Sequence, residues 1–326
     1  MLDSTPLDDD ARSRKVVALC RGALKAMWTG RYDLALKQGL AAEQAEASLA
    51  GKWPLARARL KHLEAYWYLH RGETGTAVGL FPEAEQARGQ AGDERSLTGV
   101  RTNLGFVYGQ LGRFTDAEAV LREQMAQAEL LGLTPLYHVC RHNLASILAQ
   151  RGDIDAAIAM KEPAVAWLSR AGNPRLDGNV IASLGHVLYQ VGRREEALEK
   201  AIQAEAMLRP FAPTHAYSLA VAASAQLALG DAAAALDYAA NGMAILGELG
   251  AIEEGEALLR LVYAEAAIGA GQVERGVDAM RAAAARLTER AATVEDPAHR
   301  ALFLTAVPEN ATTLARAAAL GVPPSG

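Results

Sequence analysis

The chain has 326 residues, of which 51% are hydrophobic but only 6% aromatic, and its formal net charge at pH 7 is −5. This acidic balance argues against nucleic acid as a partner, because binding to a phosphate backbone relies on clustered Lys and Arg. No stretch approaches the roughly 18 consecutive apolar residues of a membrane-spanning helix, and the N-terminus is acidic where a signal peptide would be basic. We therefore expect a soluble cytoplasmic protein without membrane insertion.

Regularly spaced glycines organise the sequence. One series recurs at intervals of 38 to 42 residues, at Gly30, Gly72, Gly112, Gly152, Gly192, Gly230 and Gly271. A second series runs between the first, at Gly51, Gly92, Gly132, Gly172 and Gly250, and Pro210 and Pro213 stand near its missing member. Glycine directly after a helix accepts the left-handed backbone of a C-cap. Two interleaved series therefore predict two helices in each repeat.

Taken in chain order, the predicted units cover residues 11–51, 52–92, 93–132, 133–172, 173–211, 212–250 and 251–292. Within them the apolar spacing is helical, as in Leu104, Val107 and Leu111. A further helical pair over 297–321 follows, and we expect it to cap the array or to dock on a second copy of the chain. The fold prediction is an all-α superhelix of seven helix-turn-helix repeats with a C-terminal cap, forming one solenoid over residues 1–326.

Several repeats carry a motif that resembles the tetratricopeptide signature, in which a Leu-Gly pair, an aromatic residue, a turn glycine and a small residue lock helix A onto helix B. The matching positions are Leu104-Gly105, Tyr108, Gly112, Ala117 and Leu121, then Leu184-Gly185, Leu188, Gly192 and Ala197, with a weaker copy at Leu144-Ala145, Leu148, Gly152 and Ala157. The 40-residue period resembles the extended variant of kinesin-light-chain-like arrays and of bacterial signalling and transcription-activator proteins.

This resemblance implies that helix A side chains face the concave surface. The implied partner-binding positions are His62, Tyr66, Arg101, Thr102, Asn103, Phe106, Arg141, His142, Asn143, Ser146, Asn179, His186 and Tyr189.

Asn103 and Asn143 lie 40 residues apart and should stack as a ladder. An amide offers both a donor and an acceptor, which suits an extended peptide backbone. The alternative is that these amides bond between neighbouring repeats. For Arg101 and Arg141, a bond to an acidic partner and a salt bridge within the array are both open.

No constellation for catalysis is apparent. There is no G-x-S-x-G elbow and no phosphate-binding G-x-x-x-x-G-K-[ST]. His138 and His142 have the i, i+4 spacing that could hold zinc, but Cys140 projects to another side of the helix and no third ligand is adjacent. We therefore expect no metal, no cofactor and no enzymatic activity, and two buried thiols at Cys20 and Cys140.

The sequence thus favours a protein-interaction scaffold that holds a peptide or protein segment in its concave groove. A second hypothesis is a sensory module of a bacterial signalling system that binds a small ligand or peptide and changes its superhelical pitch. A third, an enzyme with an unrecognised metal site, predicts bound zinc.

Overall fold

The fold consists of packed helix pairs. The computed structural model describes residues 9–49, 52–170 and 172–322, and every regular element in these ranges is an α-helix, which confirms the all-α prediction. The first helices of the seven successive pairs are α1 (Asp9–Trp28), α3 (Pro54–His70), α5 (Glu94–Gln110), α7 (Thr134–Gln150), α9 (Pro174–Gln190), α11 (Ala212–Ala228) and α13 (Glu256–Gly269). The second helices are α2 (Tyr32–Ala47), α4 (Thr74–Gln90), α6 (Phe114–Leu130), α8 (Ile154–Leu168), α10 (Arg194–Leu208), α12 (Ala232–Leu249) and α14 (Val273–Ala292).

The glycine series mark the turns between these helices. All members that the structure describes have positive φ, from 63° at Gly92 to 92° at Gly230, while Gly51 lies outside the described residues. After α5 the Arg113 amide donates to the Tyr108 carbonyl at 2.9 Å, closing the six-residue loop of a Schellman motif. In the fifth unit, the Asn173 side chain accepts a hydrogen bond from the Leu176 amide and caps α9. Glycine and capping residues therefore fix where each helix ends and begins.

Small residues let the two helices of a unit approach each other. A Cβ on Gly105 would lie 2.8 Å from the Leu121 side chain, and one on Gly185 would lie 3.1 Å from the Ala197 carbonyl. Larger side chains at these positions would separate helix A from helix B, which is the role that the signature motif implied. Within the described ranges, none of these helices is long and apolar enough to cross a membrane.

The C-terminal residues form the predicted additional pair, α15 (Pro297–Thr305) and α16 (Pro308–Ala319). α16 packs against α13 and α14. The Asn310 side chain donates to the Phe303 carbonyl at 2.7 Å and holds the two short helices together. This pair covers the last repeat, and whether it also contacts a second copy stays a prediction.

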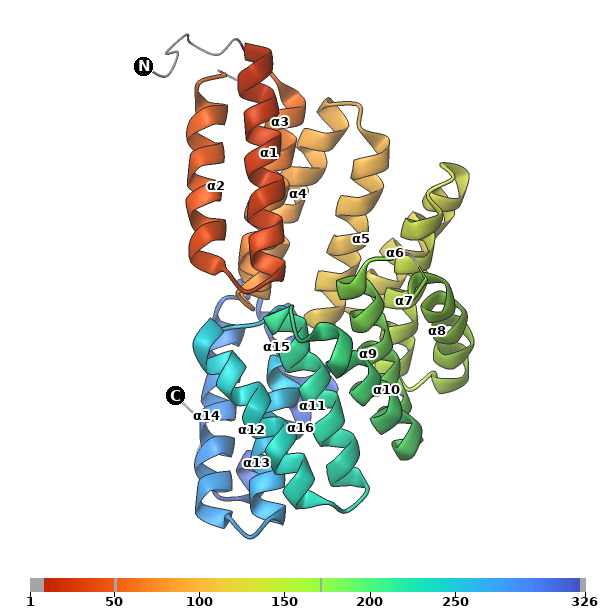
Figure 1. The fold of residues 1–326 in the computed structure, drawn as a ribbon, viewed down its shortest axis with the longest axis vertical. Helices are drawn as coiled ribbons and strands as arrows, with labels where there is room; N and C mark the ends of the chain where they lie inside the picture. The colour runs from red at the N-terminus through yellow and green to blue at the C-terminus, as the bar shows by residue number, and fades with distance from the viewer. Residues whose placement is uncertain (1–8, 50–51, 171, 323–326) are drawn as a thin grey trace.

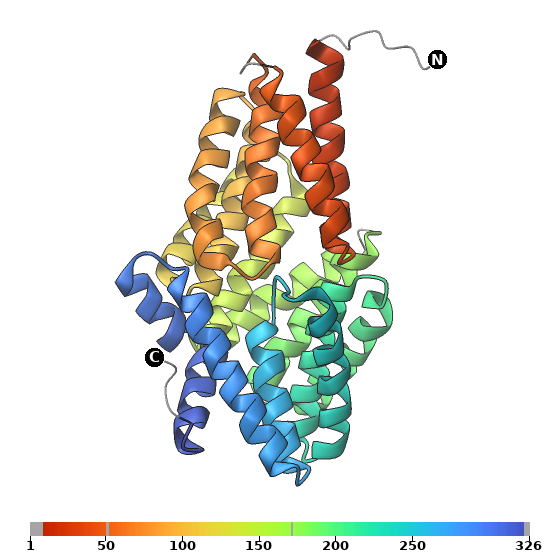
Figure 2. The same ribbon diagram turned by 90° about the vertical axis from the view of Figure 1, so that its left-hand side faces the viewer.

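The array curves until its two ends meet. The helices of the first units lie against those of the last units, red and orange above cyan and blue in Figure 1, and the side view in Figure 2 shows the same contact. α1 packs on α11 and α4 packs on α14. The Tyr32 hydroxyl donates to the carbonyls of both His70 and Ala251, at 3.2 and 3.4 Å. The concave face is therefore closed rather than open along its length.

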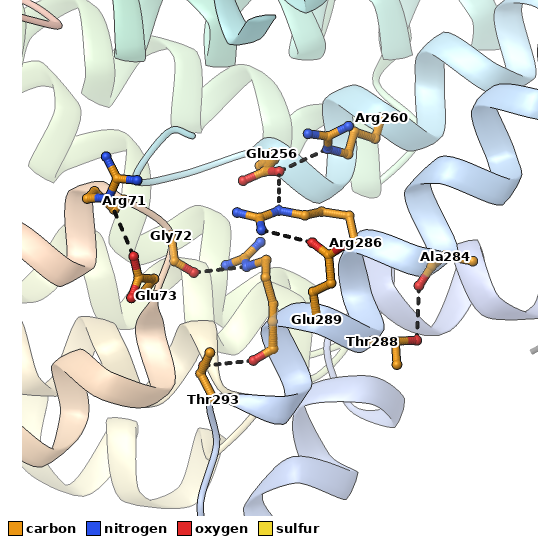
Figure 3. A network of polar contacts seen from close by, with 11 residues as sticks. Arg71, Gly72, Glu73, Glu256, Arg260, Ala284, Arg286, Thr288, Glu289 and Thr293 are labelled. Carbon is orange, nitrogen blue, oxygen red and sulfur yellow. Dashed lines mark hydrogen bonds and ion pairs between the residues drawn. The ribbon is translucent and has the colours of Figure 1, made fainter. Parts of the chain in front are cut away.

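An arginine cluster at this junction joins the two ends (Figure 3). Arg290 on α14 donates to the Gly72 carbonyl at 3.0 Å and to the Thr74 hydroxyl at 3.3 Å. Glu256 is only 2% exposed. Its carboxylate accepts hydrogen bonds from Arg260 at 2.9 Å and from Arg286 at 3.0 Å. Burial raises the pKa of Glu256, but the nearby arginines outweigh it and hold this pKa below its ordinary value.

Candidate ligand-binding cavity

A polar cavity of about 250 Å³ lies on the inner face of the array. Its walls come from α3, α5, α7, α9 and α11, and the segment between α12 and α13 closes it with Glu253 and Glu254. That segment begins at Gly250 and ends at Gly255, which have φ of 78° and 82°. The cavity thus exists because the seventh unit turns back onto the inner wall of units two to six.

Seven of the thirteen residues implied by the resemblance line this cavity. They are Tyr66, Asn103, Phe106, His142, Asn143, Ser146 and Asn179. His62 is bonded to one of them, because the Asn103 amide nitrogen lies 3.3 Å from His62 Nε2. Burial lowers the pKa of His62 to about 3, so its ring is neutral and accepts this bond. The Asn103 amide, one of the two predicted to stack, is therefore held by a hydrogen bond to the preceding repeat.

The other implied residues lie elsewhere. Arg101 pairs with Glu85 at 2.6 Å, and Arg141 donates to the Ala159 carbonyl at 3.3 Å, so both bind within the array. The Thr102 hydroxyl donates to the Thr98 carbonyl at 2.8 Å and contacts Cys140 Sγ at 3.2 Å. These three side chains are outside the set that lines the cavity.

His186 and Tyr189 lie farther along α9. His186 lines a smaller adjoining hollow of about 60 Å³, where it contacts Tyr217 and Glu309 at 3.2 Å each. Burial disfavours the charged form of Glu309, but the hydrogen bond from His186 outweighs this effect and lowers its pKa. Tyr189 stacks on the His186 ring. This part of the predicted surface is occupied by the C-terminal helix α16.

A buried lysine stands behind the cavity wall. Lys161 on α8 is fully buried, and its ammonium donates to Ser146 Oγ at 2.6 Å, to Ser183 Oγ at 2.7 Å and to the His142 carbonyl at 3.2 Å. Burial lowers the pKa of Lys161, and the negative charge of Glu254 partly opposes that shift. The lysine therefore holds the Ser146 side chain and the His142 backbone, and brings a basic group close to the cavity.

The opposite wall is acidic. Burial raises the pKa of Glu254, the adjacent Glu253 raises it further, and Lys161 and a hydrogen bond from Asn179 act in the other direction. Glu253 lies 3.3 Å from His70 Nδ1, but burial lowers the pKa of His70 and favours its neutral ring. Arg175, which also lines the cavity, stacks over Trp28 at 4.7 Å. Charges of both signs thus surround one small volume.

Comparison with known proteins gives a match at the level of structure. No protein-family model and no curated protein sequence matches the chain. A Rap protein solved in complex with competence and sporulation factor superimposes with a TM-score of 0.59 and 13% identity, over 94% of this chain and 99% of the Rap chain. The apo form of the quorum sensor NprR from B. thuringiensis has a TM-score of 0.59 and 13% identity, over 97% and 89% of the two chains.

A third match is the Rap conjugation gene regulator of plasmid pLS20 in complex with the Phr* peptide, with a TM-score of 0.61 and 11% identity, over 94% of this chain and 96% of that chain. The chain is a TPR-like helical repeat protein. At these identities the likeness concerns the fold of the TPR-like array.

Sequence reasoning missed several residues around the cavity of this TPR-like protein, among them four ionisable ones: Lys161, Arg175, Glu253 and Glu254. For Lys161 the sequence holds a signal, because the repeat period places it in register with Phe81, Leu121 and Ala201, all fully buried. A lysine at an apolar core position of a repeat points to a special role. Glu253 and Glu254 carry no such signal, since they reach the cavity only through closure of the array.

The two histidines and the one cysteine of α7 point to different neighbours. The His138 ring stacks on Trp167 at 4.6 Å, Cys140 faces Thr102, and His142 faces Lys161. In the described ranges no group of three or more His, Cys, Asp or Glu side chains could hold a metal ion. Cys20 and Cys140 are both free and buried, as expected.

A wider hollow of about 530 Å³ lies between α2 and α3 on the outside of the first units. Leu36, Leu40 and Trp67 line it, and the two leucines are among the exposed large apolar side chains. None of the thirteen implied residues lines this hollow. The inner cavity gathers seven of them and is therefore the better candidate for specific ligand recognition.

Proposed function

We propose that this chain is a non-catalytic regulatory module that binds a short peptide or peptide-like ligand in the cavity between its repeats. The observation that carries the proposal is the convergence of Asn103, Asn143, Ser146 and Asn179 from three successive units on one enclosed polar volume. Amide and hydroxyl groups offer the donors and acceptors that a peptide backbone requires. The Rap complex with the Phr* peptide supports the same class of ligand by likeness of fold.

The size of the cavity favours a short ligand over a helical protein segment. An α-helix with its side chains is roughly 10–12 Å wide, and its first turns alone need more than the volume present. Of the two leading hypotheses from the sequence, the sensory module therefore has more support than the scaffold that grips a protein segment. Ligand binding would act on the junction between the first and last units, because Glu253 lies in the segment that reaches both the cavity and His70.

Screening with a library of tripeptides by thermal shift tests this proposal. We expect at least one pool to raise the unfolding midpoint, since a ligand that binds the folded state alone stabilises it. Asn103→Ala combined with Asn143→Ala should lower the affinity of the selected peptide at least tenfold. Asn241→Ala, at an exposed amide on α12, is the matched control and should bind as the natural chain does. If no pool raises the unfolding midpoint, or if the double variant binds the selected peptide with unchanged affinity, the proposal is contradicted.

A further inference from the structure

Four ionisable groups surround the cavity, two acidic and two basic. Glu253, Glu254 and Arg175 line it, and the Lys161 ammonium lies directly behind Ser146. Among the residues that the structure describes, no ion pair joins any two of these four. The contacts that they do make are to neutral groups: Lys161 to hydroxyls and a carbonyl, Arg175 to the Trp28 ring, and Glu253 to the neutral His70.

Such an arrangement is costly for the folded protein. A charge removed from water without a counter-charge destabilises the folded state, whereas a well-placed partner recovers much of that cost. His142 also has an unsatisfied polar atom. This residue lines the cavity and is 93% buried, and its Nδ1 has no hydrogen-bond partner. Lys161 and Glu254 influence each other through their charges but form no ion pair, so partners in direct contact are expected in the ligand.

We propose that the cavity recognises a zwitterion of amino-acid to dipeptide size, whose ammonium binds Glu253 and Glu254 and whose carboxylate binds Arg175. This inference rests on the proposed function and names its ligand class. The volume of about 250 Å³ lies just below the ~300–1,000 Å³ of typical small-molecule pockets, which suits a ligand at the small end of that class. The amides of Asn143 and Asn179 then face the groups between the two ends of the ligand.

Calorimetric titration with the twenty free amino acids and with a set of unblocked dipeptides tests the inference. The two panels show whether the zwitterion is a free amino acid or a dipeptide. We expect one panel to contain a ligand that binds with 1:1 stoichiometry. Its N-acetylated and its C-amidated forms should each bind roughly 10- to 100-fold more weakly, which is what one lost charge-assisted hydrogen bond amounts to.

Variants of the cavity residues test which side chain binds each end of the ligand. Glu254→Gln should lower the affinity for the free ligand at least tenfold but leave the affinity for the N-acetylated form almost unchanged. Arg175→Gln should likewise lower the affinity for the free ligand and leave the affinity for the C-amidated form almost unchanged. Arg175→Lys keeps the charge and should recover part of the affinity. Glu265→Gln, which removes a carboxylate paired with Arg316 outside the cavity, is the control and should bind normally.

Binding of the blocked forms within twofold of the free ligand would overturn the inference, and so would absence of binding by every member of both panels. If tripeptides still bind and Asn103→Ala with Asn143→Ala still weakens their binding, the proposed function stands and only the zwitterion of amino-acid to dipeptide size is wrong. If tripeptides fail as well, both proposals fall.

Discussion

Lys161 shows how a single residue can depart from the repeat pattern. Its counterparts in units two, three and five are Phe81, Leu121 and Ala201, which fill the core between helix A and helix B. Burying an ammonium there costs free energy that an apolar side chain would not, even with its hydroxyl and carbonyl partners in place. The position therefore trades stability for a charge next to the cavity.

Replacing Lys161 by Met should separate stability from binding. We expect the free energy of unfolding, measured by urea denaturation, to stay equal or rise by about 1 kcal/mol or more, because buried charges can be replaced by apolar groups of similar volume without loss. Ligand affinity should fall, since Ser146 and His142 lose the group that positions them. A variant that is less stable than the natural chain would show that the lysine serves packing instead.

At the scale of the element, the segment before α13 determines whether the cavity exists. Gly255 has φ of 82°, and a Cβ there would lie 2.3 Å from Tyr217 Cδ2. The glycine thus allows the turn that places Glu253 and Glu254 against the inner wall. Any larger residue must shift either the segment or the tyrosine.

Gly255→Ala should therefore destabilise the chain by about 2 kcal/mol or more, from positive φ and from overpacking together. Gly247→Ala on α12 is the matched control, because a Cβ there meets nothing within 4 Å. It should leave stability unchanged or raise it by roughly 0.5–1 kcal/mol through helix propensity. Thermal and urea unfolding of both variants measure the difference. Equal behaviour of the two would mean that the segment is not held in place by this close contact.

The elements themselves were well predicted from the sequence, and the cavity only in part. Glycine positions and helical spacing are local signals, so the helix pairs follow from them directly, and a 40-residue period places Asn103 and Asn143 on one wall. Glu253 and Glu254 are absent from the predicted site, yet they lie between two helices and line the cavity. Their position depends on the total curvature of seven units, which no local pattern encodes.

At the scale of the whole molecule, the junction between first and last units depends on buried charge. Glu256 accepts from two arginines, and a third, Arg290, reaches across to the Gly72 carbonyl. Removing one member leaves the others buried without a partner, which typically costs several kcal/mol. The curvature of the array is therefore coupled to this cluster.

Glu256→Gln should lower the free energy of unfolding by about 3 kcal/mol at neutral pH and increase the radius of gyration measured by X-ray scattering. Because the folded-state pKa of Glu256 is lowered, its stabilising contribution is complete above the ordinary glutamate pKa and is lost as the pH falls through the folded-state value. The difference in stability between the natural chain and the variant should therefore shrink as the pH falls below about 4.5. Glu289→Gln, at an exposed partner of Arg286, is the control and should change little. A difference that is independent of pH would contradict this role.

Contact between α1 and α11 and between α4 and α14 has a consequence for how the molecule comes apart. An open solenoid can fray from either end, since each terminal unit is held on one side only. Here the first unit is held on two sides, so melting it also uncovers the sixth and seventh. We expect loss of order to spread around the ring as one cooperative event, and amide exchange in α1 to be nearly as slow as in the central helices.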